Sequence, residues 1–328
     1  MVMVLSAVAP VFMVIAFGML LRIFDVLREE TSAIIGAYVL KVALPVLCLH
    51  LLAASSPADL TRWNFWIALL GPQLALYFAG YAVERMFCRR GRAAAAIAGM
   101  NCSLGNAAFV GLPIILALLP GNREAGVIAG LAVFSANIIN IVGQVSLDIL
   151  KGGNFFRKGE SRLTGILRML RVVVLGNPIL MATLTGICLA AGGWGLWHPL
   201  DRVAQLVGYT AAPCMLLALG LEMRQKIVLA AKNTHWQAVA RQMWYLTAKL
   251  VLNPLLCWAA MVALGVQGLW LSIGVVMSGT ATALVVSVMA EIYRAIPEEC
   301  VLTIVLSHVL NIVTLTILLW CLHSFGLI

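Results

Sequence analysis

Charged residues are scarce in this chain of 328 residues. Asp, Glu, Lys and Arg make up 11% of it, against about 25% in soluble proteins. Hydrophobic residues make up 62%, which is more apolar surface than a soluble core can bury. This composition excludes a disordered chain, a disulfide-rich secreted domain and a free nucleic-acid-binding domain. It predicts an all-α integral membrane protein whose apolar surface is covered by lipid.

Sequence motifs of enzymes and ATP-driven pumps are also absent. The chain contains no G-x-S-x-G, no H-E-x-x-H and no G-x-x-x-x-G-K loop, and its eight cysteines form no C-x-x-C pair. All 13 acidic residues lie in predicted loops or near the ends of predicted spans. We therefore predict no catalytic residues, no metal site and no cofactor, and an intramembrane enzyme is the weaker alternative.

Ten apolar segments can be read from the sequence. Each is close to the roughly 20 residues that a helix needs to cross a bilayer. They are approximately 2–21, 32–53, 64–83, 93–118, 125–147, 172–192, 203–221, 242–264, 269–290 and 300–322. The longest predicted loop, about 150–171, is basic and lies near the middle of the chain.

Lys and Arg are concentrated in the odd-numbered loops. These hold 17 of the 22 basic residues, the even-numbered loops hold three, and Lys41 and Lys249 lie inside predicted spans. Because cytoplasmic loops are enriched in Lys and Arg, the odd-numbered loops are predicted to be cytoplasmic and both termini outside. No basic residue precedes the first apolar run, so we expect a retained span rather than a cleaved signal peptide.

The two halves of the chain resemble each other at a fixed offset of 168 residues. This offset relates three pairs with similar surroundings, namely Pro10 and Pro178, Gly18 and Gly186, and Pro45 and Pro213. Five spans per half is an odd number, so the second half would enter the membrane from the opposite face, as in the inverted repeats of many transporters. We predict a first five-helix repeat at 1–150, a basic cytoplasmic loop at 151–171 and a second repeat at 172–328. Chance recurrence of Pro and Gly is the alternative.

Two of the apolar segments are expected to be interrupted helices. Segment 93–118 carries Gly105, Asn106, Gly111 and Pro113, which weaken helical hydrogen bonding within nine residues. Segment 269–290 carries small polar residues near its middle, among them Ser278, Thr280 and Thr282. Interrupted helices at corresponding positions of two repeats indicate a binding site. Close packing of helices through small residues is the alternative.

A few polar side chains lie deep in predicted spans. Lys41 is about ten residues into its span, or about 15 Å deep, and is a functional candidate unless it bonds neighbouring carbonyls or reaches the surface. Lys249 lies nearer a span end and is expected to extend its ammonium to the cytoplasmic surface. Two stripes at helical spacing, Asn137–Asn140–Gln144 and Ser307–His308–Asn311, could hydrogen-bond between helices or line a site. His308 could also carry a proton.

The chain resembles the auxin efflux carrier family, which includes bacterial malate and malonate permeases and plant auxin exporters. The resemblance covers nearly the whole chain and rests on PVFMVIAFGMLLRIFDVL, YVLKVALPVL, GNAAFVGLPI, GNPILMATLTGI, AAPCMLLALGLEM and MAEIY. It implies ten helices in two inverted repeats, crossed helices four and nine, and a scaffold of helices one, two, six and seven beside a moving transport domain. Asn106 matches the crossover Asn of the family. Gly105 stands where plant members have a proline, and Ala281 stands where the family usually has the crossover proline of its ninth helix.

The residues and the resemblance together predict a secondary transporter in the plasma (bacterial inner) membrane. It would move a small organic anion of the malate, malonate or auxin kind by alternating access. Asn106 would bind the carboxylate, Lys41 would supply charge, and the remaining candidate site residues are Ser103, Gly105, Asn137, Asn140, Ser278, Thr280, Thr282, His308 and Asn311. A proton or sodium ion could be coupled, and a homodimer, a channel and a receptor-like binding protein remain alternatives. Lipid is the expected surrounding and no nucleic acid partner is predicted.

Overall fold

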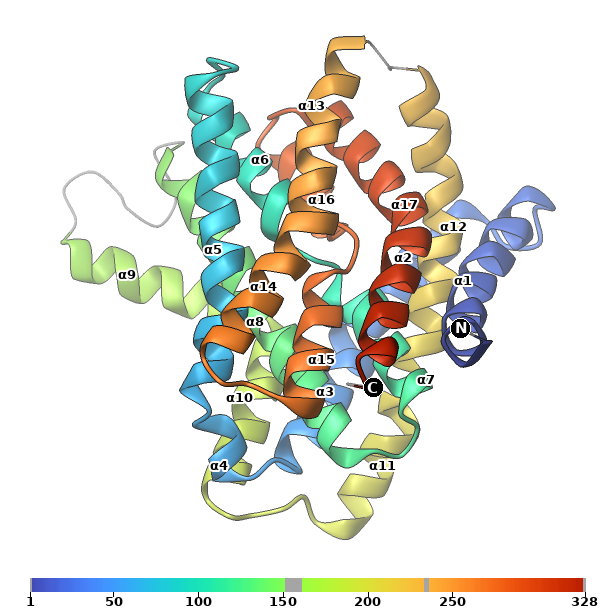
Figure 1. Cartoon of the computed structure of the whole chain (residues 1–328), viewed down its shortest axis with the longest axis vertical. Helices are drawn as coiled ribbons and strands as arrows, with labels where there is room; N and C mark the ends of the chain where they lie inside the picture. The colour runs from blue at the N-terminus through green and yellow to red at the C-terminus, as the bar shows by residue number, and fades with distance from the viewer. Residues whose placement is uncertain (1, 151–160, 233–235, 327–328) are drawn as a thin grey trace.

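The computed structural model describes residues 2–150, 161–232 and 236–326, which form an all-helical protein (Figure 1). Within these ranges the one extended pairing is an isolated antiparallel bridge between Gly105 and Thr282. The helical elements in chain order are α1 (Val2–Ile23), α2 (Glu29–Tyr38), η1 (Val39–Ala43), α3 (Leu44–Ala53), α4 (Pro57–Leu60), α5 (Trp63–Met86), α6 (Arg92–Ser103), η2 (Ala107–Gly111), α7 (Leu112–Leu118), α8 (Arg123–Leu150), α9 (Arg162–Leu170), η3 (Arg171–Leu175), α10 (Pro178–Ala191), α11 (His198–Gly208), α12 (Ala211–Lys232), α13 (Trp236–Thr247), η4 (Ala248–Leu252), α14 (Asn253–Ala263), α15 (Gly268–Ser278), α16 (Val285–Ile292) and α17 (Pro297–Ser324).

In the part of the chain that the structure describes, six stretches of helix are long and apolar enough to cross a membrane. They are Glu30–Ala53, Pro57–Met86, Arg123–Leu150, His198–Met223, Arg241–Ala263 and Pro297–Ser324. Shorter apolar helices occupy the other predicted spans, at Ala9–Ile23, Ala107–Leu118, Pro178–Ala191 and Gly268–Ser278. The predicted class, an all-α integral membrane protein, is thereby confirmed.

Two predicted loops contain more helix than expected. The basic loop at 151–171 includes α9, which projects from the side of the bundle in Figure 1, while 151–160 lies outside the described residues. After the seventh predicted span, α12 continues to Lys232 rather than ending near 221. The α5–α6 connection, the end of α12 and the start of α13 lie at one end of the bundle, and α4 and α11 lie at the other (Figure 1).

Wide helical turns precede four of the prolines. The π-helical segments η1, η2, η3 and η4 are each followed within three residues by a proline, at Pro45, Pro113, Pro178 and Pro254 respectively. Proline has no N–H for the carbonyl four residues back, so the preceding turn widens to i→i+5 bonding. Lys41 and Lys249 both lie in such turns, which set the direction of their side chains.

Both predicted interruptions are present, and their backbones pair with each other. Helical structure breaks at 104–106, between α6 and η2, and at 279–284, between α15 and α16. The Asn106 N–H donates to the Ala281 carbonyl at 2.7 Å, and the Ala283 N–H donates to the Leu104 carbonyl at 3.0 Å. We call these two segments the crossing. The pairing satisfies backbone groups that lipid could not satisfy.

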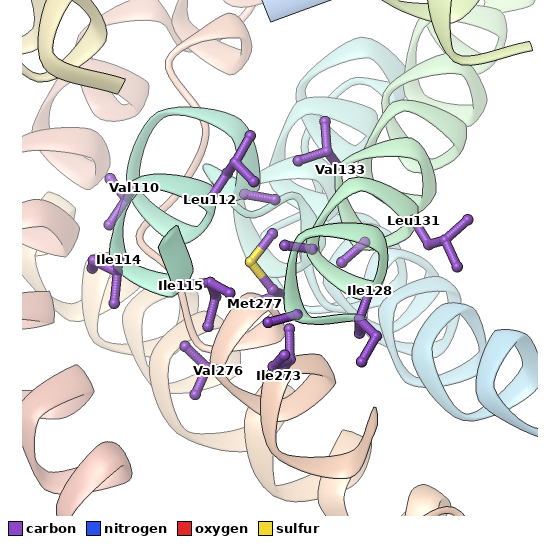
Figure 2. Packing of buried hydrophobic residues seen from close by; sticks show 14 of the residues in the cluster. Val110, Leu112, Ile114, Ile115, Ile128, Leu131, Val133, Ile273, Val276 and Met277 are labelled. Atoms are coloured by element: carbon purple, nitrogen blue, oxygen red, sulfur yellow. The ribbon is translucent and has the colours of Figure 1, made fainter. Parts of the chain in front are cut away.

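Apolar packing holds the second half of the first interrupted helix, α7, against the first half of the second, α15. Ile115 of α7, Ile128 of α8 and Met277 of α15 are buried where the three helices meet (Figure 2). Gly111 makes this approach feasible, because a Cβ there would lie 2.6 Å from the Met277 sulfur. Dense packing of this kind fixes the position of the crossing within the bundle.

Candidate functional site

A large cavity reaches the crossing from one end of the bundle. Its volume is about 1180 Å³, and most of the residues that line it are apolar. Its polar and charged lining residues are Arg22, Ser32, Lys41, Asn106, Asn137, Asn140, Gln144, Asn177 and Glu222. Arg22 ends α1, Gln144 lies in the last part of α8 and Val228 lies in the last part of α12. The cavity therefore extends from the crossing to the helix ends beside the first, fifth and seventh predicted loops.

Asn106 lies at the inner end of this cavity and is only 3% exposed. Its Oδ1 accepts a hydrogen bond from the Phe109 N–H at 3.3 Å, which caps η2. Its Nδ2 lies 3.2 Å from His308 Nε2, and His308 Nδ1 lies 2.8 Å from the Ile304 carbonyl. If the amide donates to Nε2, then Nδ1 carries the imidazole proton and donates to the carbonyl. The second amide hydrogen of Asn106 is left for a ligand.

Lys41 brings a positive charge to the same cavity. Its side chain is exposed and, among the residues that the structure describes, no carboxylate pairs with it. The π turn of η1 that carries Lys41 precedes Pro45, which lacks the N–H that the Lys41 carbonyl would accept in a regular helix. A cation in a mostly apolar cavity favours an anionic ligand.

Amide side chains line the α8 wall of the cavity. Asn137 donates to the Val133 carbonyl at 3.0 Å and accepts from Asn177 at 3.5 Å. Asn140 lines the cavity as well, and its buried Oδ1 has no hydrogen-bond partner among the described residues. Asn177 also caps α10, accepting from the Ile179 and Leu180 N–H groups. Sequence reasoning missed Asn177, although an Asn directly before a proline is a typical start of a helix.

Four of the candidate site residues hold the crossing together and do not line the large cavity. Asn311 accepts from the Ala281 N–H at 3.0 Å and donates to the Gly279 carbonyl at 2.8 Å. The Thr282 N–H donates to Ser307 Oγ at 3.2 Å, and the Thr280 hydroxyl bonds the Met277 carbonyl. His308 contacts Asn106, which lines the cavity. Each of the four is buried.

Lys249 was not predicted as a site residue, and the expectation that its ammonium reaches the cytoplasmic surface is wrong. It is fully buried rather than extended to the surface, and its Nζ donates to the Ser278 carbonyl at 2.6 Å. It lines a second, small cavity of about 10 Å³ together with Ser103 and Ser278, the two remaining candidate residues. Gly105 lines both cavities. The η4 turn directs the Lys249 side chain toward the crossing. There its ammonium donates to the Ser278 carbonyl instead of extending to water at the membrane surface.

An ion-pair cluster joins the helices around the crossing at the end near the α5–α6 loop. Glu84, 1% exposed, accepts from the Tyr245 hydroxyl at 2.9 Å and pairs with Arg90 at 3.2 Å. Arg90 and Arg241 both contact Glu299, at 2.7 Å and 3.1 Å. The hydrogen bonds to Glu299 raise the pKa of Arg90 above its usual value. This cluster ties α5, α13 and α17 into one body.

The described residues include no cluster of three His, Cys, Asp or Glu side chains that could hold a metal ion. The groups gathered at the crossing are amides, hydroxyls, the His308 imidazole and ammonium groups, which can bind a carboxylate by hydrogen bonding and charge.

Comparisons with known proteins agree with this description. A family model described as "Membrane transport protein" matches residues 3–319. A protein of Rhizobium meliloti (strain 1021) named "Putative malonate transporter" is 25% identical over 319 residues, which cover 97% of this chain and 95% of that protein. The chain therefore belongs to the membrane transport protein family, the auxin efflux carrier family that its sequence motifs resemble.

Proposed function

We propose that this protein is a secondary transporter that moves a small organic anion, a mono- or dicarboxylate, across the bacterial inner membrane by alternating access. The observation that carries the proposal is the large cavity, which ends at the crossing and presents Lys41 and Asn106 to its contents. The similar protein is named for malonate, so a short dicarboxylate is the first candidate substrate. An ammonium and a free amide hydrogen suit a carboxylate.

The structure is best interpreted as the state open to the cytoplasm. The cavity runs to the helix ends beside loops rich in Lys and Arg, which the charge bias places inside. At the opposite end α3 packs against α8. Arg123 donates to the Ala54 carbonyl at 3.0 Å, and a Cβ on Gly126 would lie 2.8 Å from Leu51 Cδ2. Access from the outside would require these two helices to separate.

We further propose that 1–150 and 172–328 are inverted repeats joined by the 151–171 segment. Helix packing supports the offset of 168 residues. A Cβ on Gly18 would meet the Leu217 carbonyl at 2.5 Å and the Gly220 Cα at 3.2 Å, because α1 packs on α12. Shifted by 168 positions, Gly18 corresponds to Gly186, Leu217 to Leu49 and Gly220 to Leu52. A Cβ on Gly186 would lie 3.1 Å from the Leu49 carbonyl oxygen and 3.1 Å from Leu52 Cβ. Equivalent residues thus make equivalent contacts, and α1, α3, α10 and α12 correspond to the expected scaffold.

Counterflow in proteoliposomes tests the proposed function. Purified protein is reconstituted with unlabelled malonate inside and labelled malonate outside, and monocarboxylates and larger dicarboxylates are tested in parallel. A carrier exchanges label inward and transiently accumulates it above the outside concentration. A channel equilibrates label without accumulation, and a receptor-like protein moves none, so either result would reject the carrier. Exchange of at least one carboxylate is expected.

The orientation can be tested by labelling single cysteines in a cysteine-free background. Lys158→Cys in the basic 151–171 segment is expected to resist an impermeant thiol reagent in intact cells and to react after permeabilisation, because this segment carries the charge bias. Ala58→Cys, an exposed position in the second loop, is the matched control and should react in intact cells. The reverse pattern would place both termini inside.

A further inference from the structure

Lys249 is a buried basic residue, and the proposed anion site gives no reason for its position. Its side chain is fully buried, and its one hydrogen bond goes to the carbonyl of Ser278, the last residue of α15. A helix C-terminus carries partial negative charge, which suits an ammonium. An ammonium has three donors, however, and no carboxylate is paired with this one in the part of the chain that the structure describes.

The surroundings of Lys249 are polar but uncharged. The polar side chains that share its small cavity are Gln73 of α5, Ser103 of α6, Ser135 of α8, Asn253 of α14 and Ser278 of α15. The titratable groups nearby are the Cys257 thiol on α14 and, through Asn106 in the crossing, His308 on α17. A neutral thiol and an imidazole carry no negative charge, so neither group is a counter-ion for the Lys249 ammonium. The small cavity, about 10 Å³, is near the minimum that holds one water molecule.

Only a thin backbone wall separates Lys249 from the large cavity. Gly105, Ala107 and Ala136 line both cavities, and none has a side chain larger than a methyl group. A Cβ on Gly105 would lie 3.1 Å from Lys249 Nζ and 2.6 Å from Thr280 Oγ1. The absence of a side chain at Gly105 therefore allows the ammonium to approach the wall of the anion cavity.

We propose that Lys249 is the proton-binding site that couples anion movement to proton movement. An ammonium removed from water is unfavourable without a counter-charge, and an anion beside Gly105 supplies that charge across a short distance of low dielectric. Anion binding and protonation then favour each other reciprocally. Lys249 takes one proton from the water of the large cavity as the anion binds and releases it when the anion leaves, so a monoanion crosses without net charge.

This inference rests on the proposed function, and a wild-type measurement tests it first. Malonate is added to the purified protein in weakly buffered solution, and proton uptake is followed with a pH indicator. Uptake of about one proton per bound anion is expected, and binding without uptake would overturn the proposal. Lys249→Arg, whose guanidinium stays charged, should bind malonate with proton uptake reduced at least fivefold.

Transport driven by an imposed pH gradient gives the second test. Wild-type proteoliposomes, with the membrane potential clamped, should accumulate labelled malonate from the acidic side. Lys249→Met removes the ammonium and keeps an unbranched side chain one atom shorter. By the same reciprocity it should bind malonate more weakly, retain counterflow at saturating malonate, and lose at least tenfold of the gradient-driven accumulation. Cys257→Ala, a change at its fully buried neighbour, is the matched control and should keep both activities.

The outcomes separate this inference from the proposed function. If the wild type shows no counterflow, the transporter proposal itself fails. If counterflow is present but the pH gradient drives no accumulation, or if Lys249→Met still accumulates malonate, the coupling role of Lys249 fails alone. Loss of gradient-driven accumulation in His308→Gln with its retention in Lys249→Met would assign the proton to His308 instead.

Discussion

Asn106→Asp is expected to reduce anion uptake at neutral pH by at least about a hundredfold. The change is nearly isosteric and preserves the oxygen that caps η2 through the Phe109 N–H. It places a negative charge at the inner end of the cavity, where the substrate carboxylate is proposed to bind, and juxtaposed like charges cost several kcal/mol. Uptake rates and Kd for malonate, measured between pH 5 and 8, check the expectation.

Asn106→Ala is the matched comparison for charge. It removes the η2 cap and the contact to His308, and a lost hydrogen bond to a charged ligand costs about 1.5–3 kcal/mol, or roughly ten- to a hundredfold in affinity. The aspartate should therefore be worse than the alanine at neutral pH. Protonation at low pH should restore part of its activity, because the added charge is then removed.

His308 provides a second test of the expected return of Asn106→Asp activity at low pH. An aspartate at position 106 would lie within hydrogen-bond distance of the imidazole and could hold it in its charged form as an ion pair. Adding His308→Gln to Asn106→Asp removes the imidazolium charge that would offset the aspartate. Only protonation of the carboxylate itself then removes the negative charge, so the double variant should regain anion uptake at a lower pH than the single variant. Asn106→Asp transporting as well as wild type at pH 7 would show that Asn106 does not contact the charge of the substrate.

The breaks in the two interrupted helices could be predicted because their causes are local. Gly105, Gly111 and Pro113 each weaken helical hydrogen bonding through their own backbone chemistry, which the sequence states directly. Sequence could not show that the freed groups of Asn106 and Ala283 would pair across 175 or more residues, with the carbonyls of Ala281 and Leu104. Such pairing depends on where the packed helices bring the two breaks.

The two intramembrane lysines show the same limit. Their positions in the spans suggested that Lys41 was deep and that Lys249 could reach the surface, but depth along the chain does not give the direction of a side chain. The η1 turn leaves Lys41 in the open cavity, and the η4 turn aims Lys249 at the end of α15. The burial of Lys249 is created jointly by α5, α6, α8 and α15, none of which is adjacent to it in sequence.

Lys41→Met is expected to weaken anion binding by about thirtyfold while the protein still folds. The ammonium lines the cavity without a partner among the described residues, so no buried counter-ion is left uncompensated by its removal. Truncating one member of a desolvated charge pair costs about 2–5 kcal/mol, and the exposure of Lys41 to the cavity favours the lower end. Titration calorimetry with malonate, beside thermal melting as a measure of folding, checks both halves of the expectation.

Two further variants separate a charge contact from packing. Lys41→Arg should recover binding only in part, because a planar guanidinium does not reproduce the geometry of a compact ammonium. Arg22→Met is the matched control, since Arg22 lines the same cavity at the end of α1 and is paired with Asp25 at 2.9 Å. A partly screened charge at a cavity mouth changes association rate and salt dependence more than affinity, so Kd should change less than about threefold. Wild-type affinity in Lys41→Met, or equal losses in Lys41→Met and Arg22→Met, would show that the cavity attracts anions by its summed field and that Lys41 makes no specific contact.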